Sequence, residues 1–149
     1  MIIRLATHAD LATIVELERR LFPDDAWPEE MLRAEIDSPY NVLLVGEDDG
    51  RIVGYAAGQA LDGNDTADIH NIAIVESERG KGHGAELFDA LLDWARSRGA
   101  TAFMLEVRAD NEVAQSLYRS RGFEPIAVRP GYYQPAGVDA VVMRREGDS

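Results

Sequence analysis

A glycine-rich segment in the middle of the chain most strongly constrains what the chain can fold into. The six residues RGKGHG (79–84) follow an apolar run, ADIHNIAIVE (67–76), and precede a run with Leu87, Leu91 and Trp94 on one helical face. The first run predicts a strand and the second an amphipathic helix. The chain must therefore pass from strand to helix through a loop with little side-chain bulk.

This geometry suits an anion. The first turn of a helix carries backbone N–H groups without intrahelical partners, together with the positive end of the helix dipole. Glycines let a ligand approach the backbone closely. Arg79, Lys81 and His83 add positive charge to the loop. The segment lacks the Gly-Lys-Ser/Thr of a Walker loop and the GxGxxG spacing of dinucleotide-binding folds. A phosphate-bearing ligand is one interpretation, and an ordinary solvated loop is the other.

The remaining segments predict a mixed α/β fold in the order βααβββαβαββ, as a single domain over residues 1–149 with a frayed tail at 146–149. A turn at Asp48-Asp49-Gly50 predicts a hairpin. The strand at 101–108 is apolar enough to be central. The expected strands are 2–6, 41–47, 51–61, 67–76, 101–108, 123–129 and 138–145, and the expected helices are 8–22, 28–36, the run that ends at Gly99, and 111–121, with Asn111 as its cap.

Composition excludes several function classes. There is no cysteine, which removes disulfides and thiolate chemistry, and the three histidines, His8, His70 and His83, show no metal-ligand spacing. We therefore expect no metal. No apolar run approaches the roughly 20 residues of a membrane span, and the N-terminus lacks a signal-peptide pattern, so we expect a cytoplasmic protein. The net charge of −12 disfavours nucleic acid and anionic membranes, and it is compatible with a cationic partner or with solubility alone.

The element order and the segment RGKGHG, which fits R/Q-x-x-G-x-G/A, resemble the Gcn5-related N-acetyltransferase (GNAT) family over essentially the whole chain. The resemblance implies a mostly antiparallel sheet of about seven strands flanked by about four helices. It also implies acetyl-CoA as co-substrate, its pyrophosphate held by the glycine loop and its pantetheine arm by a strand backbone. The cofactor-binding residues would be Ile72, Ala73, Ile74, Arg79, Gly80, Lys81, Gly82, His83, Gly84, Asn111 and Tyr118.

Three further stretches, DDAWP, LEVRADNEVAQSLYRSRGFEPIAVRPGYY and DAVVM, resemble the RimI-like N-terminal acetyltransferases, which modify ribosomal proteins. The resemblance implies direct attack of an α-amine on acetyl-CoA in a ternary complex. Glu106 would be the general base, acting through water, and Tyr118 the general acid. From the residues alone, Glu106 is a carboxylate in an apolar strand that faces solvent, a cleft or the core, where it would need a partner such as Arg108. From the residues alone, Tyr118 could equally be an ordinary aromatic residue of the core, with its hydroxyl hydrogen-bonded.

Two segments are candidates for binding the acceptor peptide. The resemblance implies that the hairpin RPGYYQPAG narrows the groove to admit a chain end, with Tyr132 and Tyr133 against the first residues and Asp139 either binding substrate or bracing the loop. The second segment is the link FPDDAWPEE (22–30), which contains Trp27 and acidic residues such as Glu30. The acidic side chains would either attract a cationic N-terminus or stabilise the N-terminus of the next helix. His70 is either a second base or a structural histidine.

Two alternatives stay open on sequence. One is a GNAT enzyme that acetylates a small amine or a lysine side chain, for which the acidic charge would attract the cation. The other is an acyl-CoA-binding module that retains the fold without catalysis; intact Glu106 and Tyr118 argue against it. The expected partners are acetyl-CoA and a protein N-terminus, in a monomer or weak dimer.

Overall fold

The computed structural model describes residues 1–146, so most of the tail expected to fray lies outside the described residues. Its elements are β1 (Ile2–Leu5), α1 (Leu11–Leu21), α2 (Glu29–Asp37), β2 (Asn41–Asp48), β3 (Arg51–Gln59), β4 (Thr66–Ile74), α3 (His83–Ser97), β5 (Ala102–Arg108), α4 (Glu112–Ser120), β6 (Glu124–Tyr133) and β7 (Val138–Arg145). The order βααβββαβαββ is confirmed. Within this part of the chain no helix is long and apolar enough to cross a membrane.

One sheet with the strand order β1-β2-β3-β4-β5-β7-β6 contains all seven strands. Every neighbouring pair is antiparallel except β4 and β5, which are parallel. β5 therefore lies inside the sheet, as its apolar sequence predicted. The β2–β3 hairpin turns at Asp49 and Gly50, both with positive φ, which confirms the predicted turn.

Some predicted boundaries were wrong. The first helix begins at Leu11 rather than residue 8, because residues 8–10 form a 3-10 turn closed by a capping box between Thr7 and Asp10. β3 ends at Gln59 instead of residue 61. β6 continues to Tyr133 rather than stopping at residue 129, since Tyr133 still pairs with Val138 of β7.

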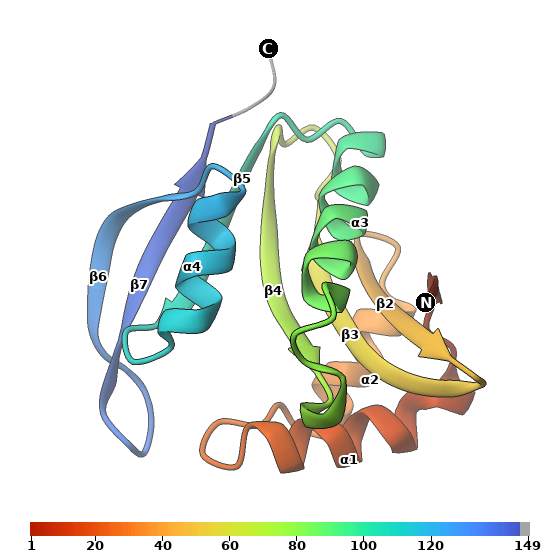
Figure 1. The fold of residues 1–149 in the computed structure, drawn as a ribbon. Coiled ribbons are helices and arrows are strands. Elements are labelled where there is room, and N and C mark those ends of the chain that lie inside the picture. Colours follow the sequence, from red (N-terminus) through yellow and green to blue (C-terminus); the bar gives the residue numbers. More distant parts are fainter. Residues whose placement is uncertain (147–149) are drawn as a thin grey trace.

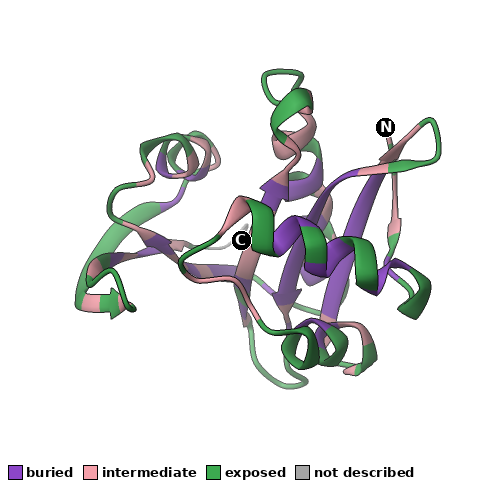
Figure 2. Cartoon of the chain, turned by 90° about the horizontal axis from the view of Figure 1, so that it is seen from below, coloured by how far each residue is buried: buried purple, intermediate pink, exposed green. Residues whose placement is uncertain are grey.

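Helices cover both faces of the sheet (Figure 1). On one face α1 and α2 pack on alternate residues of β2 and β3, including Leu43, Val45 and Tyr55. On the other, α3 and α4 pack on the opposite residues, including Leu44 and Phe103. Figure 2 shows the buried residues along the central strands and on the helix faces turned toward them, whereas the outermost strand β6 is exposed along most of its length.

The path of β4 creates the site. Ala57 of β3 pairs with Asn71, but the next residue of β3, Gly58, pairs with Ile69, so His70 is the extra residue of a β-bulge. Parallel pairing of β4 with β5 ends at the pair of Ile69 and Leu105. Beyond this point the two strands separate, and the β4 backbone groups that point away from β3 have no strand partner among residues 1–146.

Candidate active site

The glycine loop has the backbone geometry expected of an anion-binding loop. Gly80 and Gly82 have φ values of 80° and 82°, in the left-handed region that favours glycine. Gly82 is also the N-cap of α3, so the first N–H groups of a helix of 15 residues face outward from the loop. No atom lies within 4 Å of a Cβ built at either glycine, which leaves room for a ligand against the backbone.

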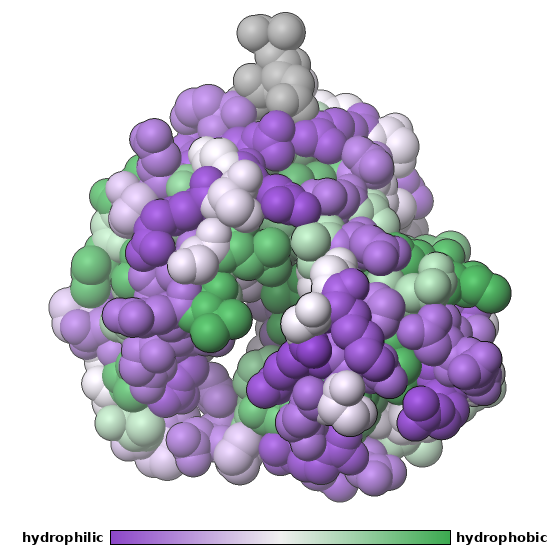
Figure 3. Space-filling model, in the orientation of Figure 1, coloured by the Kyte–Doolittle hydropathy of each residue, from purple (hydrophilic) through white to green (hydrophobic). Residues whose placement is uncertain are grey.

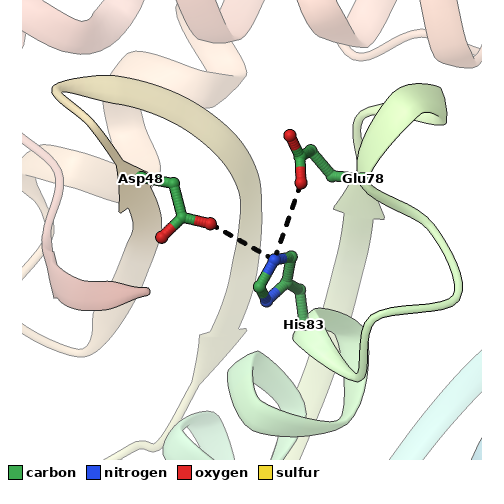
Figure 4. A group of neighbouring side chains, drawn as sticks. All are labelled: Asp48, Glu78 and His83. Atoms are coloured by element: carbon green, nitrogen blue, oxygen red, sulfur yellow. Dashed lines mark ion pairs between the residues drawn. The ribbon is translucent and has the colours of Figure 1, made fainter.

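His83 does not present its side chain to the ligand side of the loop. Its ring turns inward, and Nε2 lies 3.3 Å from Asp48 Oδ2 and 3.8 Å from Glu78 Oε2 (Figure 4). Both ring nitrogens are buried, and neither has a hydrogen-bond partner among residues 1–146. The His83 ring is therefore directed at Asp48 and Glu78, and the expectation that it adds positive charge to the loop stays a prediction. Its ring ties the start of α3 to the end of β2.

The positive side chains of the loop are largely balanced by acidic neighbours. Lys81 Nζ lies 2.8 Å from Glu78 Oε2, and Arg51 lies 3.8 Å from the other oxygen of Glu78. Arg79 Nε donates to the carbonyl oxygen of Ile74 at 3.2 Å. Asp48, Glu78 and His83 lie as close together as metal ligands do, but the cations on Glu78 already neutralise the charge that would attract a metal. Free backbone N–H groups, rather than unpaired cationic side chains, are thus what the loop offers to an anion.

Four more of the predicted cofactor residues lie on β4 and at the start of α4; Ile72 and Ile74 pack on the α3–α4 side of the sheet, whereas Ala73 packs on the α1–α2 side. Ile72, Ala73 and Ile74 lie on β4 beyond the end of its pairing with β5. Asn111 caps α4, and its Oδ1 accepts a hydrogen bond from Ala114 N at 3.1 Å, which confirms the predicted cap. The space-filling view shows a hollow between α4 and the segment around the glycine loop, bordered by hydrophobic residues (Figure 3).

On the α1–α2 side, a cavity of about 530 Å³ opens where β4 and β5 separate. Strand alternation explains its chemistry: Phe103, Leu105 and Val107 are buried in the core, so Met104 and Glu106 point to the opposite face. The cavity is lined by Trp27, Asp68, Ile69, His70, Met104, Leu105, Glu106, Arg129, Tyr132, Tyr133 and Val142. Glu106 therefore faces a cleft rather than the core or open solvent.

Glu106 has one oxygen near a cation and one without a partner. Oε1 lies 3.6 Å from Arg129 Nη1, across β7. Oε2 is buried and has no hydrogen-bond partner within the described part of the chain. Arg108, the partner considered from sequence, pairs instead with Asp110 and, at 3.6 Å, with Asp25 of the α1–α2 link. A buried carboxylate oxygen without a partner costs free energy, so it favours a ligand that donates a hydrogen bond or a proton.

The β6–β7 hairpin places two tyrosines beside Glu106. The rings of Tyr132 and Tyr133 meet edge to face, with centroids 5.1 Å apart. Burial and then the charge of Glu106 raise the pKa of Tyr133 to about 12, and burial, then a close polar contact with the Glu106 carboxylate and its charge, raise the pKa of Tyr132. Both phenols therefore stay protonated at neutral pH. Asp139 Oδ1 accepts from Gly131 N at 2.9 Å, so Asp139 braces the hairpin, the second of its two predicted roles.

Tyr118 lies in the core beneath this hairpin. It is 7% exposed, and its ring packs on Phe88 with centroids 5.2 Å apart. Burial and then the nearby Tyr133 raise its pKa well above the ordinary value of 10. Tyr118 is therefore a core aromatic with a neutral O–H group that is close enough to Tyr133 for the two phenols to interact electrostatically. It does not itself line the cavity.

Glu18, on α1, is a site residue that the sequence reasoning did not single out. It is 1% exposed and accepts three hydrogen bonds, from Tyr55 Oη at 2.6 Å, Asn71 Nδ2 at 2.8 Å and Trp27 N at 2.8 Å. Burial raises its pKa. It holds the α1–α2 link, and with it Trp27, against the cavity. The available signal was a carboxylate on the apolar face of a helix. Glu30, by contrast, is exposed in the first turn of α2 and does not line the cavity.

His70 is part of the cavity wall. Its Nδ1 lies 2.7 Å from Glu35 Oε1, and its ring lies 5.7 Å from that of Trp27. Burial alone would lower the pKa of His70, but the hydrogen bond and charge of Glu35, together with Asp68, outweigh burial and raise it. Because the raised pKa means that His70 keeps its proton to higher pH than a free histidine does, and Glu35 holds its ring, the structural one of its two predicted roles is favoured.

Comparisons with known proteins agree with this architecture. Residues 11–123 match the Acetyltransferase (GNAT) family. The chain is 39% identical over 143 residues to the N-alpha-acetyltransferase RimI of Mycobacterium tuberculosis, a match that covers 94% of this chain and 89% of that protein. An uncharacterized protein of Mycobacterium leprae is 40% identical over 149 residues, and there the chain spans only 41% of the relative's length.

A solved structure has the same fold. The ribosomal-protein-S18-alanine N-acetyltransferase of Escherichia coli superposes with a TM-score of 0.87 at 27% sequence identity, over 99% of this chain and 94% of that one. The glycine loop at a helix N-terminus, the separated strands β4 and β5 and the family match lead to the same conclusion: this chain belongs to the GNAT family of acetyltransferases.

Proposed function

We propose that this protein acetylates the α-amine of protein N-termini, with acetyl-CoA as the acetyl donor. The observation that carries the proposal is the buried, unpartnered Oε2 of Glu106 on the wall of a cavity between the Trp27 link and the Tyr132–Tyr133 hairpin. A carboxylate oxygen in that position accepts a proton from an amine directly or through one water. The names of the relatives, an N-alpha-acetyltransferase and a ribosomal-protein N-acetyltransferase, support the same class of acceptor.

An α-amine suits this base. Its reference pKa of about 7.7–8.0 leaves an appreciable neutral fraction at pH 7, whereas a lysine amine, near 10.4, is almost fully protonated. Part of the α-amine population has therefore already lost its ammonium proton at pH 7, so a carboxylate such as Glu106 is a strong enough base for the transfer. Tyr132 and Tyr133 narrow the cavity beside Glu106, which favours a chain end over a lysine in mid-chain.

The reaction divides between the two faces of the sheet. The amine nitrogen attacks the thioester carbonyl carbon, a C–N bond forms, the C–S bond breaks, and the amine proton passes to Glu106. Tyr118, held neutral by burial, donates a hydrogen bond or a proton to the leaving thiolate and is reprotonated from solvent. Because its pKa lies well above the ~8.5 of an ordinary thiol, hydrogen-bond donation is the larger part of this role. The backbone of the glycine loop holds the pyrophosphate.

The test is mass-spectrometric acetyl transfer to two peptides. One peptide has a free Ala N-terminus and no lysine; the other has a blocked N-terminus and an internal lysine. We expect acetylation of the first peptide alone. Acetylation of the lysine peptide alone would contradict the proposal, and so would acetylation of small amines with neither peptide modified. Binding of acetyl-CoA with no transfer to any amine would indicate the non-catalytic module.

A further inference from the structure

We propose that Asp68 selects acceptor peptides with a cationic side chain at the second or third residue. This inference rests on the proposed function, because it names the kind of N-terminus that the same cavity prefers. Asp68 is exposed, lies on β4 and lines the cavity together with Glu106. Its carboxylate fits the ammonium of lysine or the guanidinium of arginine.

The position of Asp68 along the sheet sets which peptide residue it meets. Asp68 is in register with Met104 of the parallel strand β5, two residues before Glu106, and all three line the same cavity. Two residues of a strand span roughly 7 Å. An extended peptide advances about 3.4 Å per residue, so a peptide with its amine at Glu106 that runs along β5 toward Met104 would bring its second or third residue level with Asp68.

Among the described residues, the Asp68 carboxylate forms no ion pair within 4 Å, unlike most of the other carboxylates around the cavity. Three other carboxylates in or behind the cavity wall are each paired with a basic side chain. These pairs are Glu106 with Arg129 at 3.6 Å, Glu35 with His70 at 2.7 Å and Asp25 with Arg108 at 3.6 Å. Glu18, also behind the wall, has its oxygens hydrogen-bonded to Tyr55, Asn71 and the Trp27 backbone.

The carboxylate of Asp68, by comparison, has no hydrogen bond or ion pair among residues 1–146. Its charge contributes to the raised pKa of His70, whose Nδ1 is already paired with Glu35. A ligand cation would therefore complete the charge pattern of the cavity at Asp68 without displacing an existing pair. Because Asp68 touches open solvent, we expect the preference to be modest.

The experiment compares acceptor peptides that differ at one side chain. Each has a free Ala N-terminus, with arginine or its neutral isostere citrulline at position 2 or at position 3. Values of kcat/KM are measured for the wild type, Asp68→Asn and the charge-reversed Asp68→Lys. Asp62→Asn is the matched control, since Asp62 is an exposed carboxylate on the β3–β4 connection outside the cavity lining.

At one of the two positions we expect kcat/KM of the wild type to be about fivefold higher for the arginine peptide than for the citrulline peptide. Asp68→Asn should reduce this ratio below about twofold, and Asp68→Lys should reverse the preference. Asp62→Asn should keep the wild-type ratio. Equal turnover of arginine and citrulline peptides by the wild type would overturn the role of Asp68, and so would equal loss of the preference in Asp68→Asn and Asp62→Asn. Failure of every peptide, citrulline included, would instead overturn the proposed function itself.

Discussion

The two sides of the sheet, where β4 and β5 separate, present different parts of the chain to the ligands that the proposed function requires. On the α3–α4 side the glycine loop offers backbone N–H groups, while Lys81 and His83 are turned to the acidic neighbours Glu78 and Asp48. On the α1–α2 side the cavity wall is made of side chains that reach it from five elements or links, Glu106 and Tyr133 among them. One side depends on backbone conformation and the other on individual functional groups.

Because of this difference, the two sides should tolerate different kinds of substitution. A backbone site tolerates exchange of its side chains but not of a glycine whose φ is positive. A side-chain site tolerates little change in the group that carries charge, because a buried oxygen without its intended partner costs about 1–3 kcal/mol. Substitutions on the two sides should therefore affect different steps: acetyl-CoA binding on one side and amine transfer on the other.

The largest effect is expected for Glu106→Gln, which keeps the shape of the side chain and removes the base. We expect kcat/KM for an N-terminal peptide to fall by about 10²–10⁴, with acetyl-CoA affinity unchanged within about twofold. Steady-state kinetics and calorimetry measure the two quantities. Glu30→Gln is the matched control, because Glu30 is exposed and outside the cavity lining, and it should leave both unchanged. A loss of less than about fivefold in Glu106→Gln would show that Glu106 is not the base.

A smaller effect, confined to the cofactor side, is expected for Gly82→Ala. A Cβ at Gly82 meets no atom within 4 Å, so any cost arises from the φ of +82° rather than from a clash. That conformation costs an alanine about 1–2 kcal/mol, which corresponds to roughly fivefold to thirtyfold weaker acetyl-CoA binding if the loop shifts to relieve it. Isothermal calorimetry of acetyl-CoA binding measures the change.

Two controls separate backbone from side chain on this loop. Gly84→Ala adds a Cβ 3.6 Å from Ile74 Cγ1, an ordinary contact at a helical position, and Lys81→Gln removes a charge already paired with Glu78. Both should change affinity by less than about threefold. If Lys81→Gln weakened binding more than Gly82→Ala, side-chain charge rather than backbone geometry would be the basis of anion binding.

Local sequence signals were enough to predict the features that depend on near neighbours. The Asp49-Gly50 turn, the Asn111 cap and the glycine loop each involve residues only a few positions apart. The apolar alternation of β5 likewise sets Glu106 apart from the core residues on either side of it. For these features the pattern of residue types and the physical cause lie in the same short segment.

The features that the sequence did not reveal depend on pairings between distant segments. The bulge at His70 exists only in the register of β4 against β3. Arg129 reaches Glu106 because β7 lies between β5 and β6 in the sheet, an order that the strand lengths do not specify. The inward turn of His83 requires Asp48 at the end of β2. To predict any of these three contacts, one must already know which distant segment lies beside the residue in the folded chain.

The smallest effect concerns the pair of His70 and Glu35, which makes the cavity wall sensitive to pH. Because the folded pKa of His70 lies above its unfolded value near 6.5, the pair stabilises the fold fully below pH 6.5, and the stabilisation is lost as pH rises through the folded pKa. Urea unfolding should give wild type an advantage over His70→Asn that is about 1 kcal/mol larger at pH 5.5 than at pH 8.5.

Glu35→Gln, which keeps the imidazole but removes its anionic partner, should abolish most of this pH dependence. An advantage of wild type that stayed constant, or that grew with pH, would mean that His70 is neutral in the folded protein. It would then be available as a second base beside Glu106, and the acceptor side would have two proton acceptors. A pH-dependent advantage instead leaves Glu106 as the group on this wall that receives the amine proton, with His70 and Glu35 holding the bulge of β4 in place.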